Sequence, residues 1–237
     1  MSRAPIASRP IVAVTGLAME ARIASGAGVR AIAGGGRAPA LIAALELEIA
    51  RGARAVISFG IAGGLAEELT SGTWIVARSI VTPTERWPCD EAWAWILAER
   101  LPEARKADLA GMDVLVRDPG AKRALRRVTG AAAVDTESHI AAAIAAAHEL
   151  PFAAIRVVAD SARRSLPPAA LVALAADGKV SGRAVLGSLA RTPAQLPSLL
   201  RTAIDASIAF RALLRGRRLL GPGLAYPDFD ELVIDMS

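Results

Sequence analysis

The feature of this sequence that most constrains its fold is an apolar run that leads directly into a glycine-rich loop. Residues 55–59 (AVISF) are typical of a short strand buried on both faces. Gly60, Gly63 and Gly64 follow, and glycines allow a tight turn that brings backbone N–H groups close to a ligand. In an open α/β sheet, ligands bind outside the carboxyl ends of the strands. The stretch therefore predicts a ligand-binding loop, with a plain glycine-rich turn as the alternative.

Strand patterns recur along the chain, and helical patterns separate them. We predict strands at residues 10–16, 29–33, 55–59, 73–81, 112–117 and 152–159, and a short apolar segment at 131–134. We predict helices at 39–51, after a loop at 84–90, at 119–127, at 135–150, and from 167 to about 215 with breaks near Gly178 and at Pro193. This alternation predicts an α/β fold, with a mostly parallel central mixed sheet and helices on both faces. There are no internal repeats, and we expect one domain over residues 1–237 with a partly extended tail from about residue 221.

Composition narrows the class of protein. Of the 237 residues, 53% are hydrophobic but only 4% are aromatic, which indicates alanine-rich helices packed closely on a sheet. Cys89 is the only cysteine, which excludes a disulfide framework and favours a reducing, cytoplasmic setting. Residues 1–10 lack the apolar region of a secretory signal, and no segment is apolar enough to cross a bilayer. The net charge of +5 favours anionic partners, but no zinc spacing or recognition-helix pattern points to nucleic acid.

Three carboxylic acids lie at the ends of predicted strands or at the start of a predicted helix. Glu20 follows the first predicted strand, Glu137 lies in the first turn of a predicted helix, and Asp160 ends the last predicted strand. Each acid also has an alternative without function. Glu20 could be a solvated first-turn acid, Glu137 a residue that stabilises a helix dipole, and Asp160 a helix N-cap. Because the strand ends of one sheet converge on one crevice, the three acids together favour a functional site.

The order of the motifs resembles the purine nucleoside phosphorylase and methylthioadenosine/adenosylhomocysteine nucleosidase superfamily. That family carries G-S-A-G-G-L followed by L-x-x-G-D-I-V-V, then V-E-M-E-A, R-x-I-S-D and, near its start, A-M-E-x-E. The corresponding segments here are GIAGGL at 60–65, LTSGTWIV at 69–76, VDTES at 134–138, VVADS at 157–161 after Arg156, and MEA at 19–21. The resemblance covers about residues 10–162. Within the superfamily, this short chain most resembles the hopanoid-associated phosphorylase branch, thought to remove adenine from adenosylhopane.

The resemblance implies cleavage of the N-ribosidic bond of an adenine nucleoside, and it gives each acid a role. Asp160 is expected to be the general acid at purine N7, which requires a raised pKa. Glu137 is expected to accept hydrogen bonds from the ribose hydroxyls, and Glu20 to lie beside the nucleophile. The other implied residues are Thr136, Gly60, Ile61, Ala62, Gly63 and Ser161 on the substrate side, and Gly16 and Arg37 on the phosphate or water side. No metal or cofactor is implied, other than inorganic phosphate if it is the nucleophile.

Departures from the family pattern leave the nucleophile open. Ile61 stands where the family has Ser or Thr, and Ser58 stands where phosphorylases often carry a phosphate-binding Arg. Thr73 replaces an Asp, and Asp135-Thr136 replaces Glu-Met. The first two weaken the case for phosphate, because a bound anion needs paired donors. Arg37 either supplies a charge, across a subunit interface, or is a solvated arginine at a helix start.

The remaining chemistry-bearing side chains have plainer interpretations. His139 and His148 are interpreted as ordinary helix residues, and Cys89 as incidental, because no histidine lies in a partner motif. Three tryptophans predict either the wall of an apolar pocket or a subunit contact: Trp87, Trp93 and Trp95.

Two rival functions fit the sequence less well. A nicotinamide-dependent oxidoreductase requires a complete glycine fingerprint and an acid about 20 residues further on, which Gly26-Ala27-Gly28 does not provide. A non-catalytic nucleoside-binding module would not need both Glu137 and Asp160. We therefore expect a small-molecule nucleoside as the partner, lipid-linked if it is adenosylhopane, and a homo-oligomer with a dimer favoured.

The stretch from residue 191 to residue 220 combines apolar side chains with arginines. Apolar residues at 196, 200, 204, 208 and 214 follow helical spacing, and their plain interpretation is a helix packed on the sheet. Arg215, Arg217 and Arg218 are harder to explain by packing and would suit anionic headgroups, at about 1 kcal/mol per charge. The alternative to packing is therefore peripheral membrane contact.

Overall fold

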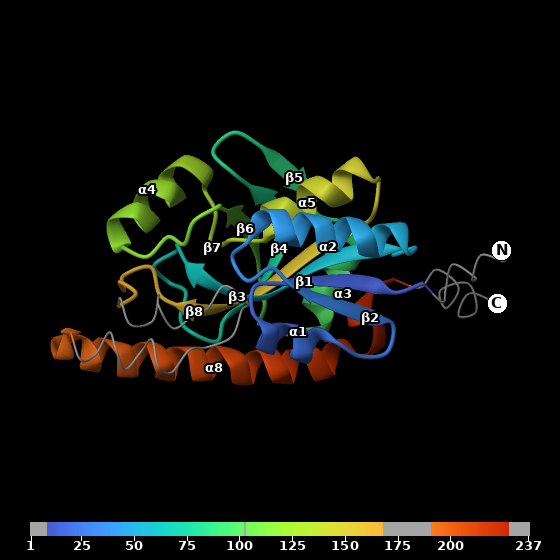
Figure 1. The fold of residues 1–237 in the computed structure, drawn as a ribbon. Helices are drawn as coiled ribbons and strands as arrows, with labels where there is room; N and C mark the ends of the chain where they lie inside the picture. Colours follow the sequence, from blue (N-terminus) through green and yellow to red (C-terminus); the bar gives the residue numbers. More distant parts are fainter. Residues whose placement is uncertain (1–8, 102, 168–190, 228–237) are drawn as a thin grey trace.

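The computed structural model describes residues 9–101, 103–167 and 191–227 (Figure 1). A mixed, mostly parallel sheet forms the middle of the molecule, and helices cover both of its faces, as the sequence predicts. None of the described helices is long and apolar enough to span a membrane.

The sheet brings strands from the whole described chain together. Its strands are β1 (Ile11–Thr15), β2 (Val29–Ala33), β3 (Ala55–Gly64), β4 (Trp74–Val81), β5 (Arg86–Pro88), β6 (Arg105–Gly111), β7 (Ala133–Asp135) and β8 (Phe152–Asp160). Their order is β2-β1-β3-β7-β6-β4-β5, and β8 pairs with both β3 and β4. The antiparallel pairs are β3–β7, β4–β5 and β4–β8.

Each face of the sheet has its own apolar core. On one face, α2 (Ala38–Ala50) and α5 (Ser138–Ala147) pack on residues such as Val56. On the other face, α1 (Ala18–Ala24), α3 (Glu91–Arg100) and α8 (Leu196–Leu220) pack on residues such as Ile57. Neighbouring residues of β3 therefore enter opposite cores, which confirms the prediction of a strand buried on both faces. The remaining helix, α4 (Pro119–Thr129), packs beside β6 and β7.

Three strand predictions were wrong or incomplete. The strand predicted at 112–117 does not form; β6 precedes it, and its charged first half hides the apolar pattern. The predicted loop at 84–90 contains the short strand β5, which pairs with the end of β4. β3 continues through its glycines to residue 64, because Gly63 and Gly64 pair with β7. The glycine-rich segment at 60–64, predicted as a loop, is therefore part of a strand of the sheet.

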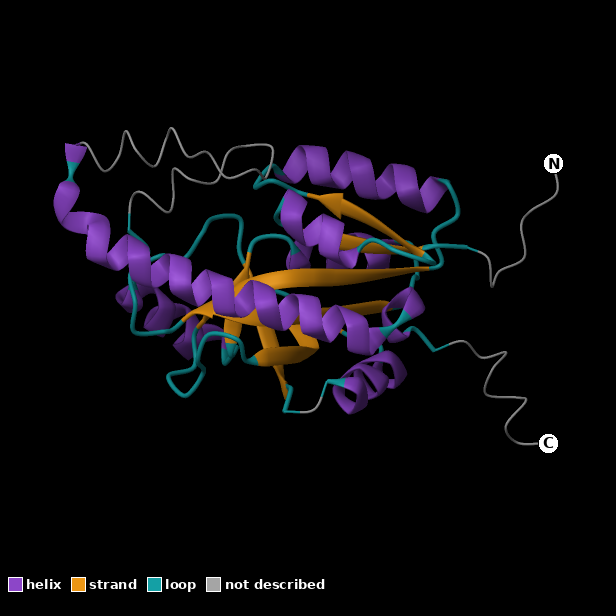
Figure 2. Ribbon diagram, turned by 90° about the horizontal axis from the view of Figure 1, so that it is seen from below, coloured by secondary structure: helices purple, strands orange, loops and turns teal. Residues whose placement is uncertain are grey.

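The long helix α8 buries a different stripe from the predicted one. Ala209, Leu213, Gly216 and Leu220 face the core, and a Cβ on Gly216 would lie 2.3 Å from the ring of Trp74. The predicted apolar stripe is mostly exposed at Leu196, Leu200, Ile204, Ile208 and Leu214. In Figure 2, the first half of α8 extends past the strands. The break predicted near Gly178 and the tail beyond residue 227 lie outside the described residues.

Candidate active site

The centre of the candidate site is the buried side chain of Arg156, in the middle of β8. Its backbone pairs with Gly60 of β3, and its side chain has no exposed surface. The guanidinium Nε donates to Asp135 Oδ2 at 3.0 Å, and Nη2 donates to Ser58 Oγ at 2.6 Å and to Ser138 Oγ at 3.2 Å. Burial alone lowers the pKa of Arg156, but the carboxyl groups around it raise that pKa above the usual value. The guanidinium is therefore a fixed cation.

Asp135 holds this cation and starts α5 at the same time. Its Oδ1 accepts hydrogen bonds from the backbone N–H of Glu137 at 2.9 Å and of Ser138 at 2.7 Å. This confirms the prediction that the segment at 135–138 caps the helix. The other oxygen accepts from Arg156. One carboxylate thus fixes both the helix that carries Glu137 and the guanidinium beside it.

Glu20 is a buried acceptor, and the alternative of a solvated first-turn acid is wrong. It is 1% exposed, and its Oε2 accepts from the backbone N–H of Gly16 at 2.9 Å and of Leu17 at 2.7 Å. Its Oε1 accepts from the N–H of Ile61 at 2.7 Å, which ties α1 to the glycine stretch of β3. Burial raises the pKa of Glu20 to about 7, against the opposing charge of Arg156. A carboxyl with this pKa suits a general base at neutral pH.

Gly60 is the point where Glu20 and Arg156 meet. A Cβ on this residue would lie 2.5 Å from Arg156 Nη1 and 2.6 Å from Glu20 Oε1. Within the described residues, Nη1 is buried and has no hydrogen-bond partner. A buried donor without a partner is costly, and it marks a place where a ligand or water binds. The absence of a side chain at Gly60 lets the guanidinium of Arg156 and the carboxyl group of Glu20 both lie against the backbone of β3.

Glu137 lies on the opposite side of the same cation. Its Oε2 is 3.7 Å from Arg156 Nη2, and its Oε1 accepts a hydrogen bond from Thr136 Oγ1. Both carboxylate oxygens lie 3.1 Å from the position of a Cβ on Gly16, so Gly16 serves the site by having no side chain. Burial raises the pKa of Glu137, while Arg156 opposes that rise. The carboxyl group is therefore held between the guanidinium of Arg156 and the backbone of Gly16.

Asp160 lies where β8 ends, across Gly63 from β7. Gly63 pairs with Val134 on one side and with Asp160 on the other, and a Cβ on it would lie 3.4 Å from Asp160 Oδ1. The carboxyl group accepts a hydrogen bond from the Nζ of Lys122, which comes from α4. Burial raises the pKa of Asp160, and the charge of Lys122 limits that rise. The N-cap alternative for Asp160 finds no support, because Ser161 and Ala162 begin a turn.

The structure brings most of the predicted residues to one edge of the sheet. Ile61 contributes its backbone N–H to Glu20, and the carbonyl of Ser161 accepts from Lys122 at 2.9 Å. Ala62 is buried beside them in β3. Arg37 is exposed at the start of α2, and no contact with the acids places it in the cluster.

Two functional residues were missed by the sequence reasoning. Arg156 was noted only as part of a motif, and its role depends on Ser58, Asp135 and Ser138, which lie far from it in the sequence. Ser58 replaces a phosphate-binding Arg of the family pattern, and here it holds the guanidinium of Arg156 instead. Lys122 lies in a basic helical run that is typical of a solvated surface, and nothing in its neighbours indicates that it is buried.

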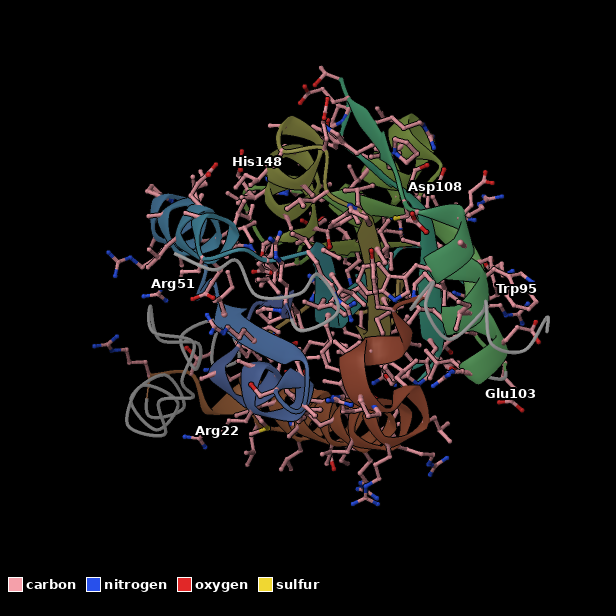
Figure 3. All side chains as sticks on the ribbon, turned by 90° about the vertical axis from the view of Figure 1, so that its right-hand side faces the viewer. Arg22, Arg51, Trp95, Glu103, Asp108 and His148 are labelled. Atoms are coloured by element: carbon pink, nitrogen blue, oxygen red, sulfur yellow. The ribbon has the colours of Figure 1, made fainter. Side chains whose placement is uncertain are left out.

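The tryptophans do not form a wall of this site. Trp93 is fully buried in the core on the α3 and α8 face of the sheet, where its Nε1 donates to the carbonyl of Leu224 at 2.9 Å. Trp87 pairs with Ile80 near the last residues of β4. It is the first residue of β4, Trp74, that pairs with Val157 of β8 near the candidate site. Trp95 is 59% exposed and points outward from α3 (Figure 3). The predicted pocket wall was therefore wrong, and the predicted subunit contact stays a prediction.

The histidines and the cysteine form no hydrogen bond to Glu20, Glu137 or Asp160 among the described residues, although the charge of His139 lowers the pKa of Glu137. His139 Nε2 is 3.0 Å from Asp113 Oδ1, and His148 Nε2 is 2.8 Å from Glu46 Oε2. Burial raises the pKa of the Cys89 thiol to about 12, which leaves too little thiolate for a nucleophile. In the described part of the chain, no group of three His, Cys, Asp or Glu side chains could hold a metal ion.

Two hollows lie along α8. Neither is lined by the site residues Glu20, Glu137, Arg156 or Asp160. One of about 380 Å³ is lined by Ser161, Arg164 and Ile208 among others. The second, of about 830 Å³, shares Ile208 with the first and reaches Arg211 and Arg215. The smaller hollow is the more relevant to the site, because Ser161 follows Asp160 directly.

The profile of the phosphorylase superfamily matches residues 7–184, which is most of the chain. The chain belongs to the phosphorylase superfamily. This membership makes it an enzyme of the class that cleaves nucleoside N-ribosyl bonds, in agreement with the buried acids of the site. No curated protein matches the sequence of this phosphorylase-superfamily member.

Solved structures share the fold of this superfamily member at low sequence identity. S-adenosylhomocysteine nucleosidase from Streptococcus pyogenes is 18% identical, over 66% of this chain and 85% of that one, with a TM-score of 0.57. Futalosine hydrolase of Helicobacter pylori is 13% identical, over 93% and 99%, with a TM-score of 0.64. The 5′-methylthioadenosine/S-adenosyl homocysteine nucleosidase of Campylobacter jejuni is 15% identical, over 87% and 99%, with a TM-score of 0.59. At these identities the likeness establishes the fold.

Proposed function

We propose that this enzyme hydrolyses the N-glycosidic bond of an adenine nucleoside. The observation that carries the proposal is the meeting of Glu20 and the unpartnered Nη1 of Arg156 at Gly60. A donor and an acceptor lie against the same backbone position there, beside the buried Glu137 and along the sheet edge that ends in Asp160. A solved nucleosidase of this fold from Colwellia psychrerythraea is in complex with adenine, which supports the choice of base.

The proposed reaction breaks the bond between C1′ of the sugar and N9 of the purine. The electron pair of that bond leaves with the purine, and Asp160 gives its proton to N7 so that the base departs neutral. Glu137 accepts hydrogen bonds from the ribose hydroxyls and favours the cationic sugar by its charge. The oxygen of a water molecule bonds to C1′, and Glu20 takes the proton that this water loses. The products are adenine and the free sugar; Glu20 then loses its proton to solvent, and Asp160 regains one from solvent.

Water fits the place at Gly60 better than phosphate does. A water molecule needs one donor to orient it and one acceptor to take its proton, which are Arg156 Nη1 and Glu20 Oε1. A phosphate dianion would face the carboxyl groups of Glu20 and Glu137, while the charge of Arg156 is already balanced by Asp135. The negative charges of phosphate and of the two carboxylates would repel one another strongly in a buried site. Phosphorolysis is the alternative, with Arg37 as the additional cation.

We further propose adenosylhopane, or another nucleoside with a large apolar 5′ substituent, as the substrate. The support is the exposed stripe of α8, in which Leu196, Leu200, Ile204 and Ile208 are 46%, 56%, 59% and 40% exposed. Ile208 ends this stripe and also lines the hollow next to Ser161. The exposed apolar stripe thus ends at the hollow beside Ser161, the residue that follows Asp160. A methylthioadenosine/adenosylhomocysteine-type nucleosidase is the alternative, and a non-catalytic binding module would not need Glu20.

A homodimer remains part of the proposal. Val114 and Leu115 are 67% and 45% exposed in the segment before α4, and Val128 within α4 is 68% exposed. Exposed apolar side chains such as the adjacent Val114 and Leu115 are typical of contact surfaces when they form a patch. Light scattering on the purified chain measures the oligomeric state directly, and a monomer at micromolar concentration would contradict the dimer.

Adenine release is the experiment that tests the proposed function. Purified enzyme is incubated with adenosine, methylthioadenosine and a 5′-alkyl adenosine, each with and without inorganic phosphate, and adenine and sugar products are separated by chromatography. We expect adenine and free ribose at the same rate in both buffers, fastest for the 5′-alkyl substrate. Ribose 1-phosphate as the product would establish phosphorolysis. A lack of adenine from all three substrates would contradict the function.

A further inference from the structure

We propose that Lys122 is a positioning residue for Asp160, which holds that carboxyl group in place and stabilises the negative charge it acquires when it gives up its proton. This inference rests on the proposed function, in which Asp160 protonates the leaving base. It adds a residue from α4 to a site whose other parts come from the strand ends and from α1 and α5.

The ammonium group of Lys122 is completely enclosed and all of its donors are used. The residue is 0% exposed, although lysine is among the residue types least often fully buried. Its Nζ donates to Asp160 Oδ2, to the carbonyl of Ser161 at 2.9 Å and to the carbonyl of Arg164 at 3.3 Å. An ammonium group has three protons, and the three acceptors match them. Lys122 therefore fixes both the carboxyl group and the turn that follows β8.

The other charged groups around Asp160 come from two further elements. Arg164 follows β8, and Asp205 lies in α8; these two side chains form an ion pair with each other. Burial raises the pKa of Asp160 most, Lys122 lowers it, Asp205 raises it and Arg164 lowers it. Of these groups, Lys122 is the one bonded to the carboxyl oxygen. Because Arg164 and Asp205 largely compensate each other, the local charge that Asp160 experiences is set by Lys122.

This arrangement suits an acid that must both hold a proton and release it. Burial favours the neutral carboxyl group, which keeps a proton available on Oδ1, the oxygen beside Gly63 that Lys122 does not bind. When the C1′–N9 bond breaks, the proton moves from Asp160 to N7 and leaves a carboxylate in a buried place. The ammonium group of Lys122 is already beside that carboxylate, so no charge has to be reorganised at the moment of transfer. Lys122 itself loses no proton in this step.

A purely structural ion pair is the competing explanation, and the pH dependence of activity separates the two. We would compare wild type with Lys122→Gln, which removes the charge but keeps an amide that can contact the carbonyls, and with Lys122→Arg, which keeps the charge. For Lys122→Gln we expect one limb of the kcat/KM profile to move to higher pH by about one unit or more, because the buried carboxyl group loses its neighbouring cation. We also expect kcat at the optimum to fall about 10-fold or more, with a smaller change in KM. For Lys122→Arg we expect both limbs to stay in place.

Lys106→Gln is the matched control, because Lys106 is an exposed lysine of β6. It should change neither the rate nor the profile. A Lys122→Gln enzyme with an unmoved profile would overturn the proposal, whatever its rate. If Lys122→Gln does not fold, Lys122→Arg decides the question, because a shifted limb in a charge-retaining variant would also contradict the role.

A second comparison separates this inference from the proposed function. Asp160→Asn is combined with Lys122→Gln, and both single variants and the double variant are assayed for adenine release. If Lys122 acts through Asp160, the second substitution costs no further activity once Asp160 is replaced. Additive losses would overturn the positioning role while leaving Asp160 as the acid. Full activity of Asp160→Asn alone would instead contradict the proposed function.

Discussion

Arg156 Nη2 lies 3.7 Å from Glu137 Oε2, and neither side chain has more than a trace of exposed surface. Through this pair, the cation proposed to orient the nucleophile is linked to the carboxylate proposed to bind the sugar. Arg156 also contacts Asp135 and Ser58, so a single residue of β8 connects β3, β7 and the start of α5. Disturbing any partner of Arg156 should therefore affect both sugar binding and the nucleophile.

Glu137→Gln should weaken ribose recognition and slow turnover. The substitution removes the charge that strengthens the hydrogen bonds to the sugar hydroxyls, and it weakens the interaction with Arg156. We expect KM for an adenine nucleoside to rise and kcat to fall, each by about 10-fold. Steady-state kinetics with a nucleoside and its 2′,3′-dideoxy analogue provide the measurement. If wild type cleaves the dideoxy analogue as well as the parent, Glu137 does not bind the hydroxyls.

Gly60→Ala should inactivate the enzyme while leaving the fold in place. The new Cβ would lie 2.5 Å from Arg156 Nη1 and 2.6 Å from Glu20 Oε1, which displaces both groups and fills the place proposed for water. We expect a loss of about 10²-fold in kcat/KM, because small misplacements of catalytic groups have effects of this size. Gly36→Ala is the control: that glycine also has a positive φ, but a Cβ there meets nothing within 4 Å. Equal losses in the two variants would point to backbone strain instead.

Activity and stability should respond to pH in opposite directions. The pKa of Glu20 is raised from 4.5 to about 7, so the proposed base is ionised only above about pH 7, and kcat/KM should fall as pH drops below that value. A raised carboxyl pKa contributes stability that is present below pH 4.5 and lost as pH rises through 7, amounting to about 3 kcal/mol. Denaturant unfolding at about pH 6 and pH 8 tests this. Wild type should be more stable at the lower pH, and Glu20→Gln should lose most of that difference.

Much of the fold could be predicted, because the apolar runs in the sequence are the segments that the structure buries as strands. β1, β2, β3, β4 and β8 are apolar runs bounded by glycine or proline, and they form where the pattern indicates. β6 was missed because only its last residues are buried, and its Arg-Lys-Ala-Asp beginning resembles a solvated segment. The helix α8 was predicted, but the stripe that faces the core was not, because two apolar stripes compete in its sequence.

The acids of the site could be predicted, but their partners could not. Glu20, Glu137 and Asp160 stand at strand ends or helix starts, and these places converge in any sheet of this kind. The burial of Lys122 depends on how α4 packs against the turn after β8, which involves contacts about 40 residues apart in the sequence. Likewise, Arg217 was assigned to a surface cluster, whereas it donates to the carbonyls of Ala24 and Gly221.

The exposed stripe of α8 predicts salt-sensitive binding to anionic membranes. Leu200 and Ile204 would enter the lipid surface, and Arg215 and Arg218 would contact headgroups. Co-sedimentation with anionic vesicles at low and high salt gives the measurement, and binding should fall at high salt. Leu200→Ser with Ile204→Ser should abolish binding, while Leu47→Ser, on the opposite face in α2, should not. No binding at low salt would leave the stripe without a membrane role.

The role of Asp160 as the acid at the leaving base is tested most directly by Asp160→Asn with two substrates. One substrate is an adenine nucleoside, whose base needs a proton in order to leave; the other is 4-nitrophenyl riboside, whose leaving group needs none. We predict that adenine release falls by at least about 10²-fold, while cleavage of the nitrophenyl riboside is retained within about 3-fold. Near wild-type release of adenine by Asp160→Asn, or equal losses for both substrates, would contradict the account.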